Sequence, residues 1–312
     1  IDLMNQFGAE FHPKNKFTFP LKIISSNYPV GINYQSGTSA QLKSAVILAG
    51  LNSYGKTIIN EKNYSRDHTE KMLSANKKTI KIVTTQKKTI TVIGKNYLNK
   101  FKIRVPGDPS SAAFFTALTL LKSSSQLKIQ NVGLNPTRIG FYLLLKKSGA
   151  KINFINIKNI NNEKVGDIIV KSSKLKPINA SKKYYLNTTD EYPILFVMSA
   201  LINGVSNFYG IGDLSNKESD RVKEMQRVLK QIGISSIYKN NNLKIFGSNK
   251  KVLTQKNIKV PDLGDHRICM SASILAFITG AKTQINNFET VNTSSPNFLK
   301  IIKNLGGKFE KK

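Results

Sequence analysis

Cysteine and long apolar segments are nearly absent from this sequence. Cys269 is the one cysteine among 312 residues, which excludes an intramolecular disulfide and any metal site built from several cysteines. No uninterrupted apolar run approaches the roughly 20 residues that a membrane-spanning helix needs. We therefore expect no membrane partner and a cytoplasmic enzyme or binding protein.

Acidic residues are also scarce, with 18 Asp and Glu against 48 Lys and Arg, and the formal net charge is +30. Such a balance suggests nucleic-acid binding, because clustered cations neutralise phosphates. Here the lysines are scattered among Asn and Ile, as in residues 155–164, without a basic stripe that alternates with aromatics. We expect no nucleic-acid partner and a general attraction of anionic ligands. A basic nucleic-acid-binding module remains the alternative.

Two kinds of helix alternate along the chain. One kind is small and apolar on every side, which predicts burial on every side. The other is amphipathic and in most copies stops at a glycine. The uniform helices are expected at residues 39–51, 110–121, 192–202 and 266–279, and the amphipathic helices at 2–8, 66–74, 139–149, 220–233 and 296–306.

Short β-branched or alternating stretches follow most of these helices and predict strands at 56–60, 126–130, 151–155, 205–209 and 282–287. The uniform helices recur about every 70–80 residues, which indicates a repeated α/β unit with buried helices and outer sheets. Counting units predicts two domains. Residues 1–104 form an incomplete first domain, and residues 105–312 form a second domain of three units.

Charged motifs precede two of the helices. Lys217, Glu218, Ser219, Asp220 and Arg221 stand before one helical pattern, and Asp265, His266 and Arg267 before another. A helix N-terminus favours anions through its free N–H groups and its dipole. Two such motifs in the same local setting predict a phosphate or carboxylate site with an acid or base beside it.

These motifs and five more resemble the 3-phosphoshikimate 1-carboxyvinyltransferase (EPSP synthase) family. The matching segments occur in the family's order over essentially the whole chain: residues 39–45, 65–70, 106–115, 133–138, 190–194, 217–221 and 265–267. The related enolpyruvyl transferase that acts on UDP-N-acetylglucosamine shares the fold, but it differs at these segments and is the alternative within the fold.

The resemblance implies an inside-out α/β barrel fold, with repeated βαβαββ units in two domains. It implies transfer of the enolpyruvyl group of phosphoenolpyruvate to the 5-hydroxyl of shikimate 3-phosphate, without metal or other cofactor, in a full-length monomer. By the same resemblance, roughly the first 130 residues of a complete enzyme precede this chain, and we expect the chain alone to be inactive.

The resemblance also assigns residue roles. Asp190 corresponds to the proposed proton acceptor, which also binds the shikimate ring, and Glu218 to the glutamate proposed to exchange the methylene proton. The expected contacts of shikimate 3-phosphate are Ser39, Gln41, Ser65, Asp190 and Lys217, and those of phosphoenolpyruvate are Gln41, Arg221 and Arg267. From the residues alone, an N-cap role for Ser39, Ser65 and Asp190 remains open.

Two positions depart from the family pattern. Some members carry a lysine for phosphoenolpyruvate near the C-terminus, where this chain has residues 289–296 without a lysine. Ala40 also stands where some members have serine, which leaves any contact there to the backbone.

Overall fold

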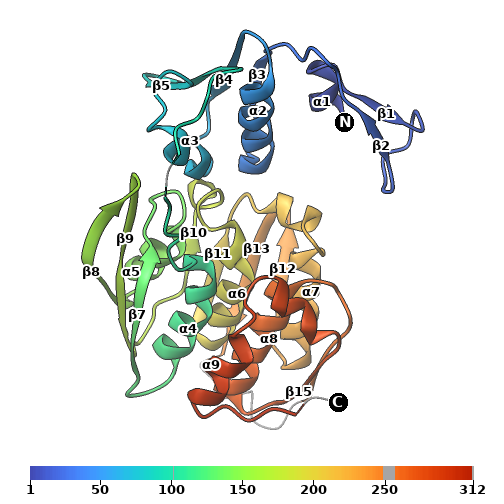
Figure 1. Cartoon of the computed structure of the whole chain (residues 1–312). Helices are drawn as coiled ribbons and strands as arrows, with labels where there is room; N and C mark the ends of the chain where they lie inside the picture. Colours follow the sequence, from blue (N-terminus) through green and yellow to red (C-terminus); the bar gives the residue numbers. More distant parts are fainter. Residues whose placement is uncertain (101, 249–256, 311–312) are drawn as a thin grey trace. The chain divides into compact units, whose positions relative to one another are not determined.

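The computed structural model describes residues 1–100, 102–248 and 257–310 (Figure 1). The chain forms two compact units. The first consists of Ile1–Arg104 and Asn159–Glu163, and the second of Val105–Lys158 and Lys164–Lys312.

Each unit contains a four-stranded sheet, and the two sheets have the same topology. The first has the order β3 (Asn33–Ser36), β4 (Lys56–Glu61), β6 (Lys88–Ile93), β5 (Ile80–Thr84). The second has the order β10 (Asn179–Ala180), β11 (Gly204–Phe208), β13 (Asn242–Gly247), β12 (Ser236–Lys239). In both sheets the first pair of strands is parallel and the other pairs are antiparallel. The chain therefore repeats one folding pattern.

The helices occupy equivalent places in these two repeats. In the first, α2 (Ala40–Asn52) joins the parallel strands and α3 (His68–Leu73) precedes the hairpin. In the second, α6 (Tyr192–Leu201) and α7 (Arg221–Gln231) take the same places. Both repeats thus have the predicted βαβαββ order, in which a crossover helix connects the parallel strands.

The second unit holds two further sheets. In one, the order is β7 (Gln126–Gly133), β9 (Glu163–Lys171), β8 (Lys151–Ile160), with α4 (Pro109–Leu121) before β7 and α5 (Gly140–Lys147) after it. In the other, β14 (Asn257–Val260) and β15 (Lys282–Ile285) are parallel and are joined by α8 (His266–Thr279), with α9 (Phe298–Asn304) following. The remaining elements are α1 (Asp2–Gln6), β1 (Glu10–His12), β2 (Lys22–Ile24) and the 3-10 helices η1 (Lys182–Tyr184), η2 (Thr189–Glu191), η3 (Gly212–Asn216) and η4 (Phe288–Thr293).

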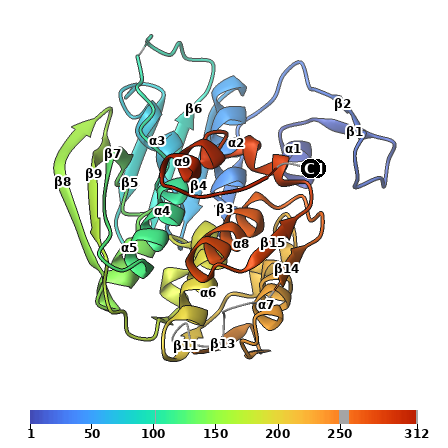
Figure 2. The same ribbon diagram turned by 90° about the horizontal axis from the view of Figure 1, so that it is seen from below.

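The uniform helices form the centre of the second unit. Helices α4, α6 and α8 pack against one another, and the sheets lie outside them (Figure 2). Every residue of α6 is buried, as its uniformly apolar sequence predicts. The expectation of inner helices and outer sheets is confirmed for this unit. No helix in the described ranges has the length and apolar character needed to cross a membrane.

Two glycines sit where each repeat closes its antiparallel strands against a helix end. A Cβ atom on Gly94 would lie 1.9 Å from the carbonyl oxygen of Ser53, and one on Gly247 would lie 1.8 Å from that of Ile202. No side chain fits such a space, so only glycine allows this close backbone approach.

Candidate active site

Helices α7 and α8 both begin at an aspartate cap, which explains why the charged motifs stand at helix starts. The Asp220 carboxylate accepts a hydrogen bond from the Lys223 backbone N–H (3.0 Å). The Asp265 carboxylate accepts one from the Arg267 N–H (2.9 Å). A cap of this kind satisfies an amide that the helix leaves unpaired, and it fixes the direction of the residues around it.

Asp265 also connects the two motifs. It is fully buried, and its Oδ2 accepts hydrogen bonds from Arg221 Nε (3.0 Å) and from Ser219 Oγ (2.8 Å). One carboxylate thereby caps α8 and orients the arginine that begins α7. The sequence placed Asp265 in a motif but gave it no role, although a cap beside a conspicuous arginine was the available signal.

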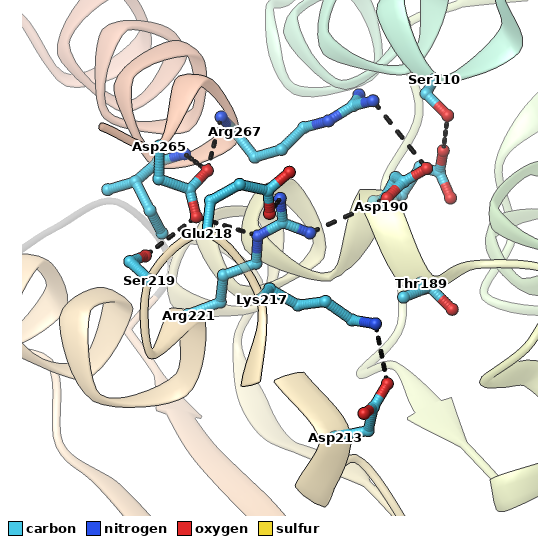
Figure 3. Close-up of polar contacts among 12 residues, drawn as sticks. Ser110, Thr189, Asp190, Asp213, Lys217, Glu218, Ser219, Arg221, Asp265 and Arg267 are labelled. Atoms are coloured by element: carbon cyan, nitrogen blue, oxygen red, sulfur yellow. Dashed lines mark hydrogen bonds and ion pairs between the residues drawn. The ribbon is translucent and has the colours of Figure 1, made fainter. Parts of the chain in front are cut away.

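Arg221 is surrounded by three carboxylates. Besides its bond to Asp265, its Nη2 donates to Glu218, and its Nη1 lies 3.8 Å from Asp190 Oδ1 (Figure 3). The side chain is 1% exposed, so these charges interact in a poorly solvated setting. The guanidinium thus lies between the two carboxylates, Asp190 and Glu218, to which the family resemblance assigns proton transfer.

Arg267 has few partners for a buried cation. Its Nη2 lies 3.9 Å from Asp190 Oδ2, and the side chain is 9% exposed (Figure 3). Its Nε and Nη1 are buried and have no hydrogen-bond partner among the described residues. Buried donors are nearly always paired, so unpaired ones need an explanation, and a guanidinium binds carboxylate or phosphate through two parallel hydrogen bonds. The arrangement suits an anionic ligand beside Asp190.

Lys217 contacts a residue that the sequence reading missed. Its Nζ lies 2.8 Å from Asp213 Oδ2, which also accepts a hydrogen bond from the Tyr185 hydroxyl (2.7 Å). Burial opposes ionisation of Asp213, but the bonds from Lys217 and Tyr185 outweigh it and lower its pKa. The four-residue spacing of Asp213 and Lys217 was a usable signal for this pair.

The other predicted ligand contacts belong to the first unit. Ser39 caps α2 by accepting a hydrogen bond from the Leu42 N–H (3.3 Å), and Gln41 is exposed in the first turn. Ser65 is buried, and both its N–H and its hydroxyl donate to Glu61 Oε1, at 2.8 and 2.7 Å. The hydroxyl proton of Ser65 is therefore engaged within the protein, which leaves its oxygen lone pairs as the available atoms.

Asp190, Glu218, Arg221 and Arg267 thus meet in one cluster of the second unit, and Lys217 lies in the same view (Figure 3). Burial and then the neighbouring Arg267 lower the pKa of His266, which keeps its imidazole neutral at pH 7. Within the described part of the chain, no group of three or more His, Cys, Asp or Glu could hold a metal ion.

The family model and two curated relatives that match this chain carry the same family description. The family model described as EPSP synthase (3-phosphoshikimate 1-carboxyvinyltransferase) matches residues 1–302. A 3-phosphoshikimate 1-carboxyvinyltransferase of Paramagnetospirillum magneticum is 35% identical over 99% of this chain and 69% of its own length. Its counterpart from Petrotoga mobilis is 38% identical over 98% of this chain and 70% of its own length.

Solved structures agree. An EPSP synthase from Acinetobacter baumannii superposes with a TM-score of 0.81 at 33% identity, covering 97% of this chain and 69% of that one. The enolpyruvyl transferase NikO from Streptomyces tendae, at 13% identity and a TM-score of 0.75, shares the fold. The inside-out α/β fold expected from the sequence is thereby confirmed. The chain belongs to the 3-phosphoshikimate 1-carboxyvinyltransferase (EPSP synthase) family, whose enzymes transfer an enolpyruvyl group in the shikimate pathway of aromatic amino acid biosynthesis.

Proposed function

We propose that the cluster around Arg221 and Arg267 is the reaction centre for enolpyruvyl transfer from phosphoenolpyruvate to the 5-hydroxyl of shikimate 3-phosphate. The buried guanidinium of Arg267, with two nitrogens unpaired among the described residues, is the observation that supports it best. The two substrates carry several negative charges, and they would supply the acceptors that these donors lack.

The proton steps follow from the two carboxylates. In the addition step, the hydroxyl oxygen bonds to C2 of the enolpyruvyl group, Asp190 takes the hydroxyl proton, and Glu218 gives a proton to the methylene carbon. In the elimination step, Glu218 takes a proton back from the new methyl group, the C=C bond re-forms, and phosphate leaves with the proton that Asp190 had taken. Each step needs a base or acid within reach of the reacting atom and fixed cations for the charge that develops.

The cations have separate roles in this proposal. Arg221 and Arg267 hold phosphoenolpyruvate, since a rigid guanidinium fits carboxylate and phosphate better than an ammonium does. Lys217, next to Asp213, contacts shikimate 3-phosphate. The family resemblance assigns the same ligand to Ser39, Gln41 and Ser65 of the first unit, and phosphoenolpyruvate also to Gln41. Because Ser65 donates to Glu61, it would orient the phosphate site through its oxygen or change its bond when ligand binds.

The test replaces Arg267 by lysine in the full-length enzyme. Arg267→Lys keeps the charge but removes the planar pair of donors, so we expect phosphoenolpyruvate affinity to fall roughly 10- to 100-fold, with a much smaller loss for shikimate 3-phosphate. Calorimetric titration with each ligand, and phosphate release with both, measure the two effects. Arg227→Lys is the matched control, because Arg227 belongs to α7, is 58% exposed and pairs with Glu224. Equal losses for both ligands in Arg267→Lys would contradict the assigned role.

The proposal extends to the organisation of the enzyme. Residues 1–104 and 105–312 would be its two domains, its partners would be these small molecules without nucleic acid, and the full-length form would be a cytoplasmic monomer. Light scattering of the full-length enzyme tests the monomer. A gel shift with duplex DNA at two salt concentrations tests the exclusion of nucleic acid, because generic binding would be tight at low salt and collapse as salt rises.

A further inference from the structure

Glu191 directly follows Asp190 and has no role in the reaction described above. It is 2% exposed and stands at the N-cap position of α6, but its side chain makes no capping bond. Its carboxylate instead accepts a hydrogen bond from the hydroxyl of Ser110 in α4. A glutamate this deeply buried is rare unless it is paired, so its partners matter.

Ser110 belongs to a short hydrogen-bond chain. Arg138 Nη2 donates to Ser110 Oγ (2.8 Å) and to Asp108 Oδ1 (2.7 Å), and Asp108 caps α4. Since Ser110 Oγ accepts from Arg138, its proton is directed to Glu191. These hydrogen bonds hold the Glu191 carboxyl in one place, and the Ser110 hydroxyl is a donor that favours its charged form.

The charged and titratable groups around Glu191 come from several elements. They are Asp190 and Tyr192 on its own segment, Asp108 and Arg138 through Ser110, Tyr142 of α5 and Arg267 of α8. Burial and then the charge of Asp190 raise the pKa of Glu191 to about 7, against the opposing influence of Ser110 and the two arginines. The carboxyl therefore changes its charge in the neutral range.

We propose that Glu191 is a positioning residue for Asp190: its carboxylate, when charged, strengthens Asp190 as a proton acceptor, and Ser110 and Arg138 hold it where it does so. This inference rests on the proposed role of Asp190 in taking the hydroxyl proton.

The physical basis is the reciprocity of coupled ionisations. If the negative charge of Asp190 makes Glu191 harder to ionise, then the negative charge of Glu191 makes Asp190 harder to ionise by the same free energy. Above the midpoint of Glu191, Asp190 thus has a higher proton affinity and accepts a proton from a hydroxyl more readily. Below that midpoint Glu191 is neutral and the effect disappears.

The first experiment measures the coupling without turnover. The carboxyl carbon of Glu191 is followed by NMR against pH in protein carrying 13C-labelled glutamate. Asp190→Asn should lower the titration midpoint of Glu191 by about one pH unit or more, because the neighbouring charge is gone. Ser110→Ala should move the midpoint the other way, because the donor that favours the charged form is lost.

Glu224→Gln is the matched control. Glu224 is another buried glutamate of the second unit, its partner is Arg227, and the variant should leave the Glu191 midpoint unchanged. An unchanged midpoint in Asp190→Asn overturns the proposal, whatever happens to activity.

The second experiment reads the effect on catalysis in the active enzyme. Glu191→Gln should lower kcat roughly three- to tenfold at about pH 8.5, and leave it unchanged at about pH 5.5, where the native residue is also neutral. An equal loss at both pH values indicates a merely structural role and overturns the proposal. If Glu191→Gln does not fold, Ser110→Ala serves instead, with the inflection of kcat against pH expected to move upward together with the NMR midpoint.

A separate result would show that the proposed proton-acceptor role of Asp190 is wrong. Full turnover by Asp190→Asn would remove Asp190 as the proton acceptor, and the proposal with it, even if the NMR coupling were present. A coupling that is absent while Asp190→Asn is inactive overturns only the role of Glu191.

Discussion

Each unit of the chain buries a cluster of cations and carboxylates, and the two clusters differ in which atoms remain unpaired. In the first unit, Lys43 Nζ lies 2.9 Å from Glu61 and 2.8 Å from Glu70, and Lys88 Nζ lies 2.9 Å from Glu70 and 3.5 Å from Glu61. Each ammonium thus contacts both carboxylates. Among the described residues, no hydrogen bond reaches Glu61 Oε2 or Glu70 Oε2, although Glu61 Oε2 is the atom that lies 3.5 Å from Lys88 Nζ.

In the second unit the atoms left over are donors. Arg221 Nη1 and Arg267 Nε and Nη1 are buried without a hydrogen-bond partner among the described residues. Spare acceptors in a sealed group of equal charges offer nothing to an anion, whereas spare guanidinium donors do. The comparison teaches that the number of buried charges does not identify a binding site, but the kind of atom left unpaired does.

The largest expected effect on the free energy of unfolding comes from a substitution in the cluster of the first unit. Lys43→Met removes the cation between two fully buried carboxylates, and breaking a buried pair from one side costs about 3–5 kcal/mol of the free energy of unfolding. Urea unfolding, with hydrogen exchange of the β4 and β6 amides, measures the loss. The double variant with Glu61→Gln restores the charge balance and should recover part of it. A loss under about 1 kcal/mol would show that these charges do not hold the unit together.

The dependence of stability on pH should have opposite signs in the two units. Glu61 has a lowered pKa, because its bonds from Lys43 and Ser65 outweigh burial, so its contribution is present above its ordinary pKa and is lost as pH falls through the lower folded value. Glu191 has a raised pKa of about 7, so its charged form opposes folding and stability falls as pH rises from its ordinary value of 4.5 toward 7.

Paired glutamine variants measure this contrast. Glu191→Gln should be more stable than the native chain above about pH 7, by up to about 3 kcal/mol, and equal to it near pH 4. Glu61→Gln should be less stable than the native chain at every pH above the ordinary value. Urea unfolding from about pH 3 to pH 8 covers both windows, and differences of the same sign for the two variants at about pH 8 would contradict the assigned environments.

The smallest expected effect on the free energy of unfolding comes from removing a cation of the cluster in the second unit. Arg267→Met removes buried donors that lack partners, so we expect the free energy of unfolding to change by less than about 1 kcal/mol while phosphoenolpyruvate binding is lost. Thermal unfolding and calorimetric titration of the same preparation separate the two effects. A destabilisation as large as that of Lys43→Met would mean that Arg267 supports the fold.

The repeated helices could be predicted because their sequences are uniform. The segment 266–279 was predicted as a helix and is α8, and 192–202 differs from α6 by one residue. The expected strands did not include β6, whose inward-facing positions begin with a lysine, Lys88. In the structure that lysine points inward and is buried, which only its contacts with Glu70 and Glu61 make tolerable.

The candidate site was predictable where a charged residue coincides with a helix start, as at Arg221 and Arg267. It was not predictable where two like residues adjoin. Asp190 is partly exposed and Glu191 is buried, and only the 3-10 turn η2, which directs their side chains differently, separates them. The sequence also did not show that Ser65 donates to Glu61, because this contact depends on how the chain turns after the end of β4.

Gly94 and Gly247 occupy equivalent positions in the two βαβαββ repeats. Each glycine follows or ends the last strand of its repeat and touches the end of that repeat's crossover helix, so the two glycines occupy equivalent positions. Along the chain, the strands β7, β8 and β9 lie between the two repeats. A methyl group at either point would have to push a peptide carbonyl aside, and the neighbouring strand would move with it. These two positions therefore mark the equivalent point in the two repeats of this chain.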